Sequence, residues 1–378
     1  MITMKFLKFL PLLLLFSLLL AACGDPVTQS SGIGPIDSPA SSTQPAVTPA
    51  VMAIGKFREY PLPQRNSGPM RPAIDHEGRI WFGEMNQNYL AVFDPRTYKF
   101  QQMKPPHGLS GIMGVEVASD DTIWFAEQYA DYIGHYLPKT GHFQIYALPT
   151  LTVPDPSDAS KMLTLPSAPN DLALDKDGNV WFTELNADAI GRLNPRSGSI
   201  QQYPLSAKKS AEMLDPYGIT VDSQDMVWFT ESGSGRIGRL NPSTGQMGFF
   251  VPSTGKNIAL MEITSGTHGT IWITTFNSIL LSLDSATGNF RTFYAPTVSA
   301  PASGTGGLYG VVTDPTTGDI WVTVASQNVL ARLDVASGRF TYYPIPTSSS
   351  LPLGIMAGAN NTFWFTEAGS DKIGMLQV

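Results

Sequence analysis

Seven tryptophans in the same kind of sequence context set the strongest constraint on the fold. Each stands in a short apolar run, and successive tryptophans lie 43 to 57 residues apart. They are Trp81, Trp124, Trp181, Trp228, Trp272, Trp321 and Trp364. A repeat of roughly forty to fifty residues, with several short apolar runs in each copy, is typical of a β-propeller. The sequence therefore predicts an all-β fold with seven blades.

Each copy can be divided into four strands, as the third copy illustrates. The alternating run Asn170–Asp175 predicts the innermost strand, and Val180–Glu184 predicts the second. Ile190–Asn194 and Ser199–Leu205 predict the third and fourth strands. Because consecutive strands run antiparallel, the loops after the second and fourth strands lie on one face of the ring. We name this face the loop face.

The two ends of the repeat predict how the ring closes. The seventh copy stops after its third strand, at Val378. A run that fits its fourth strand, Lys56–Leu62, precedes the first copy and resembles the outer runs Gln201–Leu205 and Thr341–Ile345. We expect this N-terminal strand to complete the seventh blade, so that residues 56–378 form one closed propeller.

The N-terminal residues predict export and lipid attachment. Two lysines precede the apolar run Phe9–Ala22, which is shorter than the roughly 20 residues needed to span a bilayer. Leu20-Ala21-Ala22-Cys23 resembles the bacterial lipobox, in which the cysteine is lipidated and becomes the mature N-terminus. We expect residues 1–22 to be a signal peptide and Cys23 to carry the lipid anchor.

The segment 23–55 is predicted to be a disordered tether, because it is rich in Pro, Ser and Thr and has few residues that could form a core. This organisation places a monomeric propeller outside the cytoplasm, anchored to a bacterial membrane at the cell surface or facing the periplasm. Nucleic acid is not an expected partner. The net charge is −7, and no basic run is present that could neutralise a phosphate backbone.

One carboxylate recurs in most copies, at the end of the second strand. It is absent from only two copies, and we name the other five the strand-end glutamates: Glu84, Glu127, Glu184, Glu231 and Glu367. A residue that most copies share usually serves the fold, for example by accepting hydrogen bonds from neighbouring loops. A ring of carboxylates on the loop face could also bind Mg²⁺ or Ca²⁺, which prefer oxygen ligands.

Positions where the copies differ are better candidates for function. The first row of the innermost strands, which we name the rim, consists of Met70, Met113, Asn170, Tyr217, Met261, Tyr309 and Leu353. Such residues suit either an apolar ligand or a plug that fills the channel. In the next row four copies have Gly and three carry charge. We predict a ligand site formed by Met70, Arg71, Met113, Asn170, Asp171, Tyr217, Met261, Glu262 and Tyr309.

Two further features point to the loop face. His107 is the one histidine predicted to lie in a loop between blades on this face, which makes it a candidate for acid–base chemistry, although a loop histidine is often simply solvated. Two insertions, Leu151–Ala168 and Pro296–Gly307, lengthen loops of the same face. Loops that grow on one face of a rigid scaffold are typical of binding faces.

The repeated unit WFTE…IGRLNP…TG…YPL resembles that of the virginiamycin B (streptogramin B) lyase family of seven-bladed propellers, over about residues 56–378. The resemblance implies enzymes that open a cyclic depsipeptide by elimination, with Mg²⁺ held by glutamate and with histidine as the base. The family places histidines before the innermost strands of the sixth and seventh blades, where this chain has Tyr309 and Leu353. The family glutamate at Glu367 is retained. Without the histidines, the proton acceptor that the elimination needs is missing.

Two functions remain open at this point. The first is a surface-tethered module that binds a small molecule, a peptide or a glycan at the mouth of the channel. The second is an enzyme, either a divergent lyase or a metal-dependent hydrolase similar to the gluconolactonase propellers. In the enzyme, Asp171, Glu184 and Glu262 would hold Mg²⁺ or Ca²⁺ and activate water or a carbonyl. Its candidate catalytic residues are His107 and Glu367.

Overall fold

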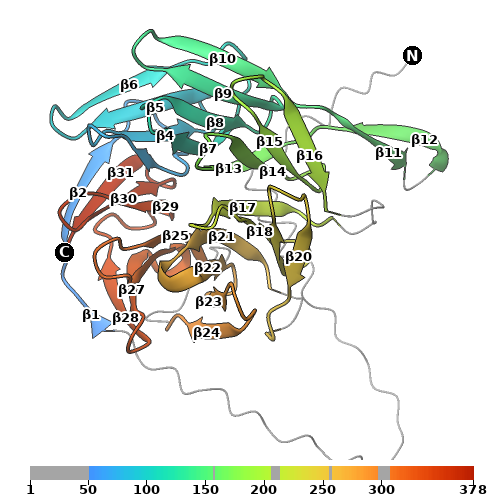
Figure 1. The fold of residues 1–378 in the computed structure, drawn as a ribbon. Coiled ribbons are helices and arrows are strands. Elements are labelled where there is room, and N and C mark those ends of the chain that lie inside the picture. The colour runs from blue at the N-terminus through green and yellow to red at the C-terminus, as the bar shows by residue number, and fades with distance from the viewer. Residues whose placement is uncertain (1–50, 156–157, 206–212, 255–257, 297–306) are drawn as a thin grey trace, which may run out of the picture.

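The computed structural model of the chain is a ring of seven large β-sheets around a central axis (Figure 1). It describes residues 51–155, 158–205, 213–254, 258–296 and 307–378. The predicted signal peptide, Cys23 and most of the predicted tether lie outside these residues. Helical structure in the described part is limited to two single turns, η1 (Thr267–Gly269) and η2 (Ala325–Gln327), and no helix there is long and apolar enough to cross a membrane.

Each sheet is one blade, and the innermost strands of neighbouring blades contact one another around the channel. The innermost strands are β3 (Ala73–Ile74), β7 (Ile112–Val117), β13 (Pro169–Leu174), β17 (Pro216–Val221), β21 (Leu260–Ser265), β25 (Leu308–Thr313) and β29 (Pro352–Ala357). The second strands are β4 (Ile80–Glu84), β8 (Ile123–Glu127), β14 (Val180–Glu184), β18 (Val227–Glu231), β22 (Thr270–Thr275), β26 (Ile320–Val324) and β30 (Thr362–Glu367).

The outer half of each blade is equally regular. The third strands are β5 (Tyr89–Asp94), β9 (Tyr132–Leu137), β15 (Ala189–Leu193), β19 (Arg236–Leu240), β23 (Ile279–Asp284), β27 (Val329–Asp334) and β31 (Lys372–Gln377). The outermost strands of the first six blades are β6 (Lys99–Met103), β10 (His142–Ala147), β16 (Ile200–Pro204), β20 (Met247–Phe250), β24 (Phe290–Tyr294) and β28 (Arg339–Pro344). In the third blade the four predicted strands agree with the structure to within one residue at each end.

The predicted closure of the ring is confirmed. Strand β2 (Lys56–Pro61) pairs antiparallel with β31 and completes the seventh blade, with Lys56 opposite Gln377 and Pro61 opposite Lys372. A second N-terminal strand was not predicted. Strand β1 (Val51–Met52), at the end of the segment expected to be a tether, runs parallel to β28 on the edge of the sixth blade. It is held there by the backbone, since Ala53 N also donates to Tyr342 O at 2.9 Å.

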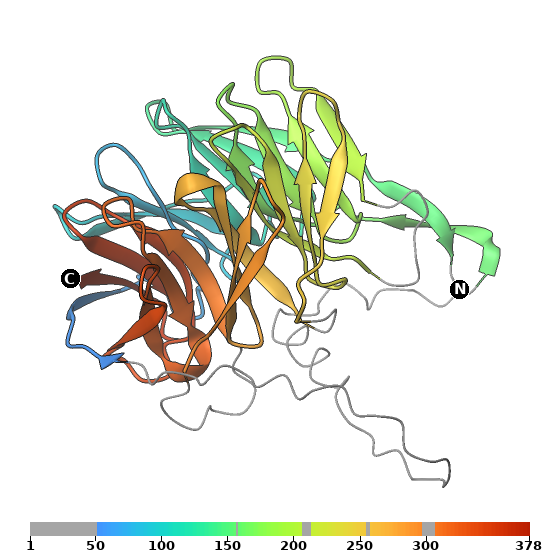
Figure 2. The same ribbon diagram turned by 60° about the horizontal axis from the view of Figure 1, so that its bottom comes forward.

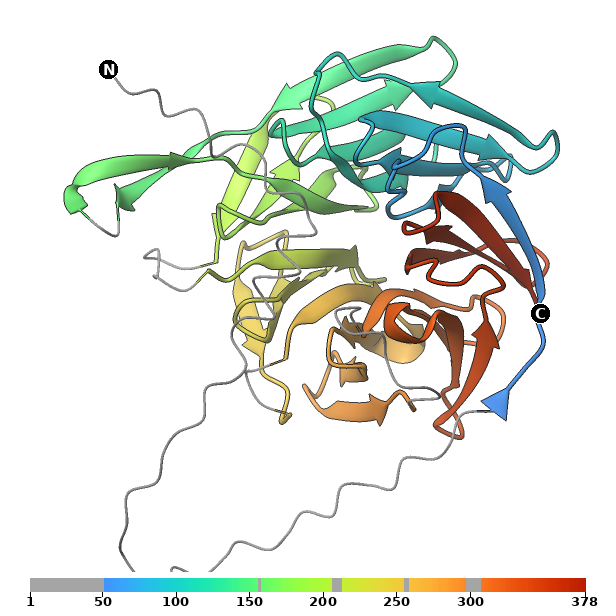
Figure 3. The ribbon, with the colours of Figure 1, turned by 180° about the vertical axis from the view of Figure 1, so that it is seen from behind.

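The insertion Leu151–Ala168 forms a hairpin instead of an irregular loop. Strands β11 (Leu151–Asp155) and β12 (Asp158–Leu165) pair antiparallel and extend away from the ring, as all three ribbon views show (Figures 1, 2 and 3). Most of the second predicted insertion, residues 297–306, lies outside the described residues.

The residues shared by the copies build the blades. In the third blade the Trp181 indole donates to Asp175 at 2.9 Å, which ties the second strand to the turn that precedes it. Phe182 lies directly against Gly191, where a Cβ atom would come within 2.1 Å of the ring. The repeated Ile-Gly of the third strand is therefore required by the phenylalanine beside it. These contacts position the innermost strands around the channel.

Candidate functional site

A β-bulge near the start of the innermost strand directs the predicted site residues away from the blade. In the third blade the register shifts between Pro169 and Leu172, so Asn170 and Asp171 have no directly paired residue on β14, although Asp171 N donates to the Thr183 hydroxyl at 3.1 Å. The same shift occurs in the second and in the fourth to seventh blades. Because bulges redirect side chains, the rim and the row after it are free to meet at the centre of the ring.

The rim closes the mouth of the channel. Met70, Met113, Met261, Tyr309 and Leu353 pack into one apolar cluster and are at most 7% exposed. The one polar rim residue is also satisfied, because Asn170 Nδ2 donates to the backbone oxygen of Tyr217 at 2.9 Å. This packing favours a plug that fills the centre of the ring over an open site for an apolar ligand. We name this group of rim residues the plug.

The three charged residues of the next row meet below the plug and form one ion cluster. Arg71 Nε and Nη2 both donate to Glu262 Oε1, at 2.9 and 2.5 Å, and Arg71 Nε lies 3.4 Å from Asp171 Oδ1. Arg71 Nη1 also donates to the backbone oxygen of Asn170. Burial alone would lower the pKa of Arg71, but the charges of Asp171 and Glu262 outweigh it and raise the pKa well above its usual value. The guanidinium thus ties together the first, third and fifth blades.

The glycines of this row explain why the charged residues alternate around the ring. Each charged residue has glycine in the preceding blade, and a Cβ on that glycine would press against the neighbouring innermost strand. A Cβ on Gly114 would lie 3.2 Å from Asp171 Oδ1, and one on Gly354 would lie 2.8 Å from Arg71 Cα. Large side chains in consecutive blades would collide, so the row alternates over most of the ring.

Two tyrosines of the rim join the ion cluster to the plug. The hydroxyls of Tyr217 and Tyr309 are hydrogen-bonded to each other, and the Arg71 guanidinium lies 5.3 Å from the centre of the Tyr217 ring. Burial raises the pKa of Tyr217 to about 12, and burial together with Tyr217 raises the pKa of Tyr309 well above its usual value. Both phenols are therefore neutral near pH 7, and Tyr309 cannot act as a strong base there.

The strand-end glutamates lie apart from one another, each with its own surroundings at the loop-face end of its blade. Gln102 donates to Glu84 at 2.7 Å and Gln202 donates to Glu184 at 2.5 Å. Burial raises the pKa of Glu184 to about 7, and does the same for Glu127 and Glu367. These contacts favour a role of the strand-end glutamates in the fold over a ring of carboxylates that binds a metal ion.

The structure does not bring Asp171, Glu184 and Glu262 together in one place. In the described part of the chain, no three His, Cys, Asp or Glu side chains are close enough together to hold one ion. Glu184 accepts a hydrogen bond from Gln202 of its own blade, at the loop-face end of that blade. Asp171 and Glu262 instead form ion pairs with Arg71. Spacing along the repeat could not distinguish a metal from a guanidinium as the partner of two carboxylates.

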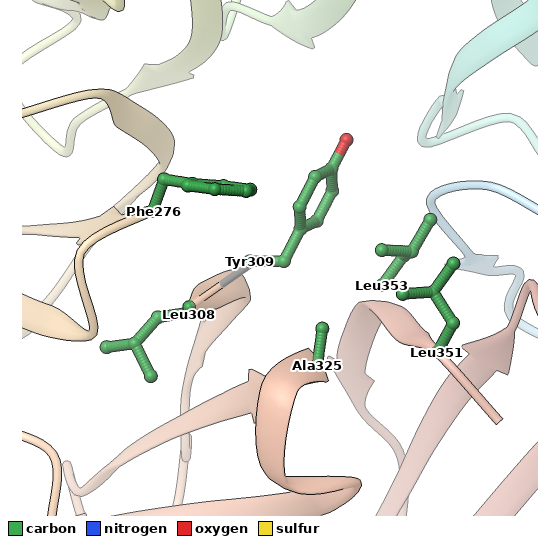
Figure 4. A pocket seen from close by; sticks show the side chains of 7 residues that line it. Phe276, Leu308, Tyr309, Ala325, Leu351 and Leu353 are labelled. Atoms are coloured by element: carbon green, nitrogen blue, oxygen red, sulfur yellow. The ribbon is translucent and has the colours of Figure 1, made fainter. Parts of the chain in front are cut away.

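A pocket opens beside the plug, between the sixth and seventh blades (Figure 4). Tyr309 and Leu353, at the positions where the sequence resemblance implies histidines, form part of its wall. Figure 4 shows the side chains of Phe276, Ala325 and Leu351 around the same space. These three were not predicted, because they come from loops whose sequences do not follow the repeat. Glu367, the glutamate that the resemblance implies to be retained, is fully buried and accepts a hydrogen bond from Ser370 at 2.8 Å.

The second blade holds further unusual groups. His107 lies on the loop face, as predicted, with its ring stacked on Tyr132 and Nδ1 3.5 Å from Glu127 Oε2. Burial raises the pKa of Glu116, which is not among the predicted site residues, to about 8. The signal was present, because the other copies have no charged residue at this position; they have Ala73, Ala173, Thr220, Thr264, Val312 and Met356.

Comparisons with known proteins agree with this architecture. A profile of the virginiamycin B lyase family matches residues 261–378. The solved structure of virginiamycin B lyase from Staphylococcus aureus is 27% identical to this chain, with a TM-score of 0.73 and coverage of 86% of this chain and 99% of the enzyme. A catalytically inactive histidine-to-alanine variant of that enzyme, solved with quinupristin, is also 27% identical, with a TM-score of 0.72 and the same coverage.

A more distant structure shows the fold alone. The extracellular domain of a one-component system from B. thetaiotaomicron is 15% identical, with a TM-score of 0.63, and the match covers 85% of this chain and 40% of that chain. No curated protein sequence matches this chain. The predicted resemblance to virginiamycin B lyases and the predicted seven-bladed propeller are both confirmed.

Proposed function

We propose that this chain is a lipid-anchored, extracytoplasmic binding protein whose propeller holds an apolar ligand in the pocket between the sixth and seventh blades. The observation that carries the proposal is the wall of this pocket. Tyr309 and Leu353 stand where the lyase family is expected to have histidines, and the other lining residues are Phe276, Gly307, Leu308, Ala325 and Leu351. Such a wall can hold an apolar molecule. It offers no group that would accept a proton at neutral pH.

The lining residues also narrow the class of ligand. The pocket presents one tyrosine and otherwise apolar side chains around an empty volume of about 210 Å³, which suits a small apolar molecule or one apolar side chain of a larger peptide better than a glycan. The structure of a catalytically inactive virginiamycin B lyase with quinupristin supports the idea that binding can persist when activity is lost. The metal-dependent alternative has less support, because Arg71 already pairs with Asp171 and Glu262.

Titration of the full-length chain in detergent with quinupristin tests the proposal. Calorimetry should give saturable binding, and Leu353→Asp should abolish it by placing an unpaired charge in an apolar wall. The matched control is Met162→Asp, at a side chain that is 58% exposed on the projecting hairpin. Absence of saturable binding, or equal binding by Leu353→Asp, would contradict the proposal.

The anchor is tested separately. In a bacterial host, Cys23→Ser should move the protein from the membrane fraction to the soluble extracytoplasmic fraction, because several acyl chains would otherwise hold it firmly. Retention of the variant in the membrane fraction would argue against lipidation at Cys23.

A further inference from the structure

Glu127 is the one strand-end glutamate with no hydrogen-bond donor for either carboxylate oxygen among the described residues. Each of the other four has a donor: Gln102 for Glu84, Gln202 for Glu184, Arg236 for Glu231 and Ser370 for Glu367. Glu127 is as deeply buried as its counterparts, at 0% exposure. A buried carboxylate without a partner is costly, so its retention needs another explanation.

The difference arises from one position in the outermost strand. In the first and third blades the donor glutamine lies opposite the small residue of the third strand, as Gln202 lies opposite Gly191. In the second blade the residue opposite Gly134 is Ile145, which cannot donate a hydrogen bond. The second blade therefore lacks the glutamine that serves this glutamate in the first and third blades.

A histidine lies where the donor would otherwise approach. His107 Nδ1 is 3.5 Å from Glu127 Oε2. The imidazole is held by stacking on Tyr132, with ring centres 4.0 Å apart and planes 8° from parallel. Nδ1 is buried and has no hydrogen-bond partner, yet the side chain as a whole is 32% exposed. The ring is thus fixed with one nitrogen facing the carboxylate and with part of its surface reaching solvent.

A third unsatisfied group belongs to the same loop. Ser110 is fully buried and its Oγ lacks a partner. Its backbone lies beside the residues that follow Glu127, because Tyr129 N donates to Ser110 O at 3.0 Å. His107, Ser110 and Glu127 hold four of the eleven buried side-chain nitrogen and oxygen atoms without partners in the described part of the chain. Of these atoms, His107 Nδ1 and Glu127 Oε2 face each other, so a charged partner would be stabilised between them.

The separation of the nitrogen and the oxygen suits a shared cation better than a direct hydrogen bond. An N–H···O bond usually spans about 2.7–3.2 Å, which is shorter than the observed 3.5 Å. A metal ion about 2.1 Å from each atom would see them at an angle of roughly 110°, which is close to tetrahedral. The two atoms therefore have the spacing of neighbouring ligands of one ion.

We propose that His107 and Glu127 form a binding site for a divalent transition-metal ion of the Zn²⁺ type. A mixed set of imidazole nitrogen and carboxylate oxygen favours such ions over Mg²⁺ and Ca²⁺, which prefer oxygen alone. No third His, Cys, Asp or Glu of the described residues completes the set, so water would have to supply the remaining ligands. The site lies on the loop face of the second blade and shares no residue with the apolar pocket.

Metal titration of the full-length chain in detergent, after treatment with a chelator, tests this site. Co²⁺ should give a saturable visible absorption band with one ion per chain, and Zn²⁺ should displace it. Zn²⁺ should also raise the melting temperature, because an ion that binds the folded state stabilises it. His107→Ala and Glu127→Gln should each weaken Co²⁺ binding by about tenfold or more, since each removes a direct ligand. His107→Gln serves as a second variant if His107→Ala does not fold.

Two control variants separate this site from other histidines and glutamates. His76→Ala removes a surface histidine whose Nδ1 is hydrogen-bonded to Asp121 at 2.7 Å, and Glu184→Gln changes the equivalent glutamate of the third blade. Both should bind Co²⁺ as the unmodified chain does. The proposal is overturned if the unmodified chain shows no saturable binding at millimolar Co²⁺. It is equally overturned if His107→Ala and Glu127→Gln bind normally, or if His76→Ala abolishes binding.

Discussion

The second strands of the blades are nearly alike around the ring, whereas the innermost strands differ at the positions that meet in the channel. In the second strands, the indoles of Trp81, Trp181 and Trp228 each donate to an aspartate of their own blade, at 2.7 to 2.9 Å. In the innermost strands, one repeat position holds Arg71 in the first blade and Asp171 in the third, and these side chains contact each other across the channel.

The difference shows what each region does. Residues that most copies share make contacts within one blade or with its neighbour, so every blade needs them. Residues that differ make contacts that a repeat cannot specify, because the partners come from blades far apart in the sequence. Arg71 and Glu262 are 191 residues apart and form the shortest ion pair of the central cluster. The rim and pocket follow the same rule, which is why the functional proposals rest on positions where copies differ.

The largest effect is expected from removing strand β2, which closes the ring by completing the seventh blade. Deletion of Lys56–Pro61 takes the outermost strand from the seventh blade and exposes one side of β31. We expect loss of cooperative thermal unfolding and of most near-ultraviolet circular dichroism. Deletion of Val51–Met52, which only adds a fifth strand to the sixth blade, is the control and should leave a cooperative transition. An unchanged melting curve after the first deletion would contradict the closure.

A smaller effect is expected from breaking the central cluster. Arg71→Ala leaves Asp171 and Glu262 buried without their cation, which should lower the free energy of unfolding by about 3 kcal/mol or more. Urea denaturation measures this change. Arg96→Ala, at an arginine whose side chain is 61% exposed, is the control and should unfold as the unmodified chain does. Equal stability of both variants would show that the cluster does not brace the ring.

The smallest effect concerns the strand-end glutamates and appears only as a pH dependence. Burial raises the pKa of Glu184 to about 7, above its value in the unfolded chain. Between roughly pH 4.5 and 7 the unfolded chain loses this proton and the folded chain keeps it, so the group lowers stability as the pH rises. Glu184→Gln should therefore raise the melting temperature at pH 8 and leave it unchanged near pH 4.5. A variant less stable than the unmodified chain at pH 8 would contradict this assignment.

The fold was predictable because the same pattern of strands and turns recurs in seven copies along the sequence. The tryptophan spacing predicts the number of blades, and the Tyr-Pro-Leu run before the first copy predicts that β2 completes the last blade. The meeting of Arg71, Asp171 and Glu262 could be anticipated from their shared row. Their pairing into an ion cluster could not, because it depends on which of three charged side chains reaches across the channel.

The pocket and the His107–Glu127 pair were less accessible to prediction. Phe276 and Leu351 reach the pocket from loops that do not keep the repeat pattern. The pairing of His107 with Glu127 depends on the path of the loop between the first two blades. One clue was present in the sequence, since Ile145 replaces the glutamine that serves this glutamate in the first and third blades.

The fate of quinupristin after incubation with the full-length chain distinguishes binding from catalysis. We expect quinupristin to bind and to be recovered intact. After removal of the protein, liquid chromatography should show the cyclic compound alone, at every incubation time. Chromatography is needed because ring opening by elimination leaves the mass unchanged. Recovery of a linear product that increases with time and protein concentration would contradict the claim that the pocket binds without performing the reaction.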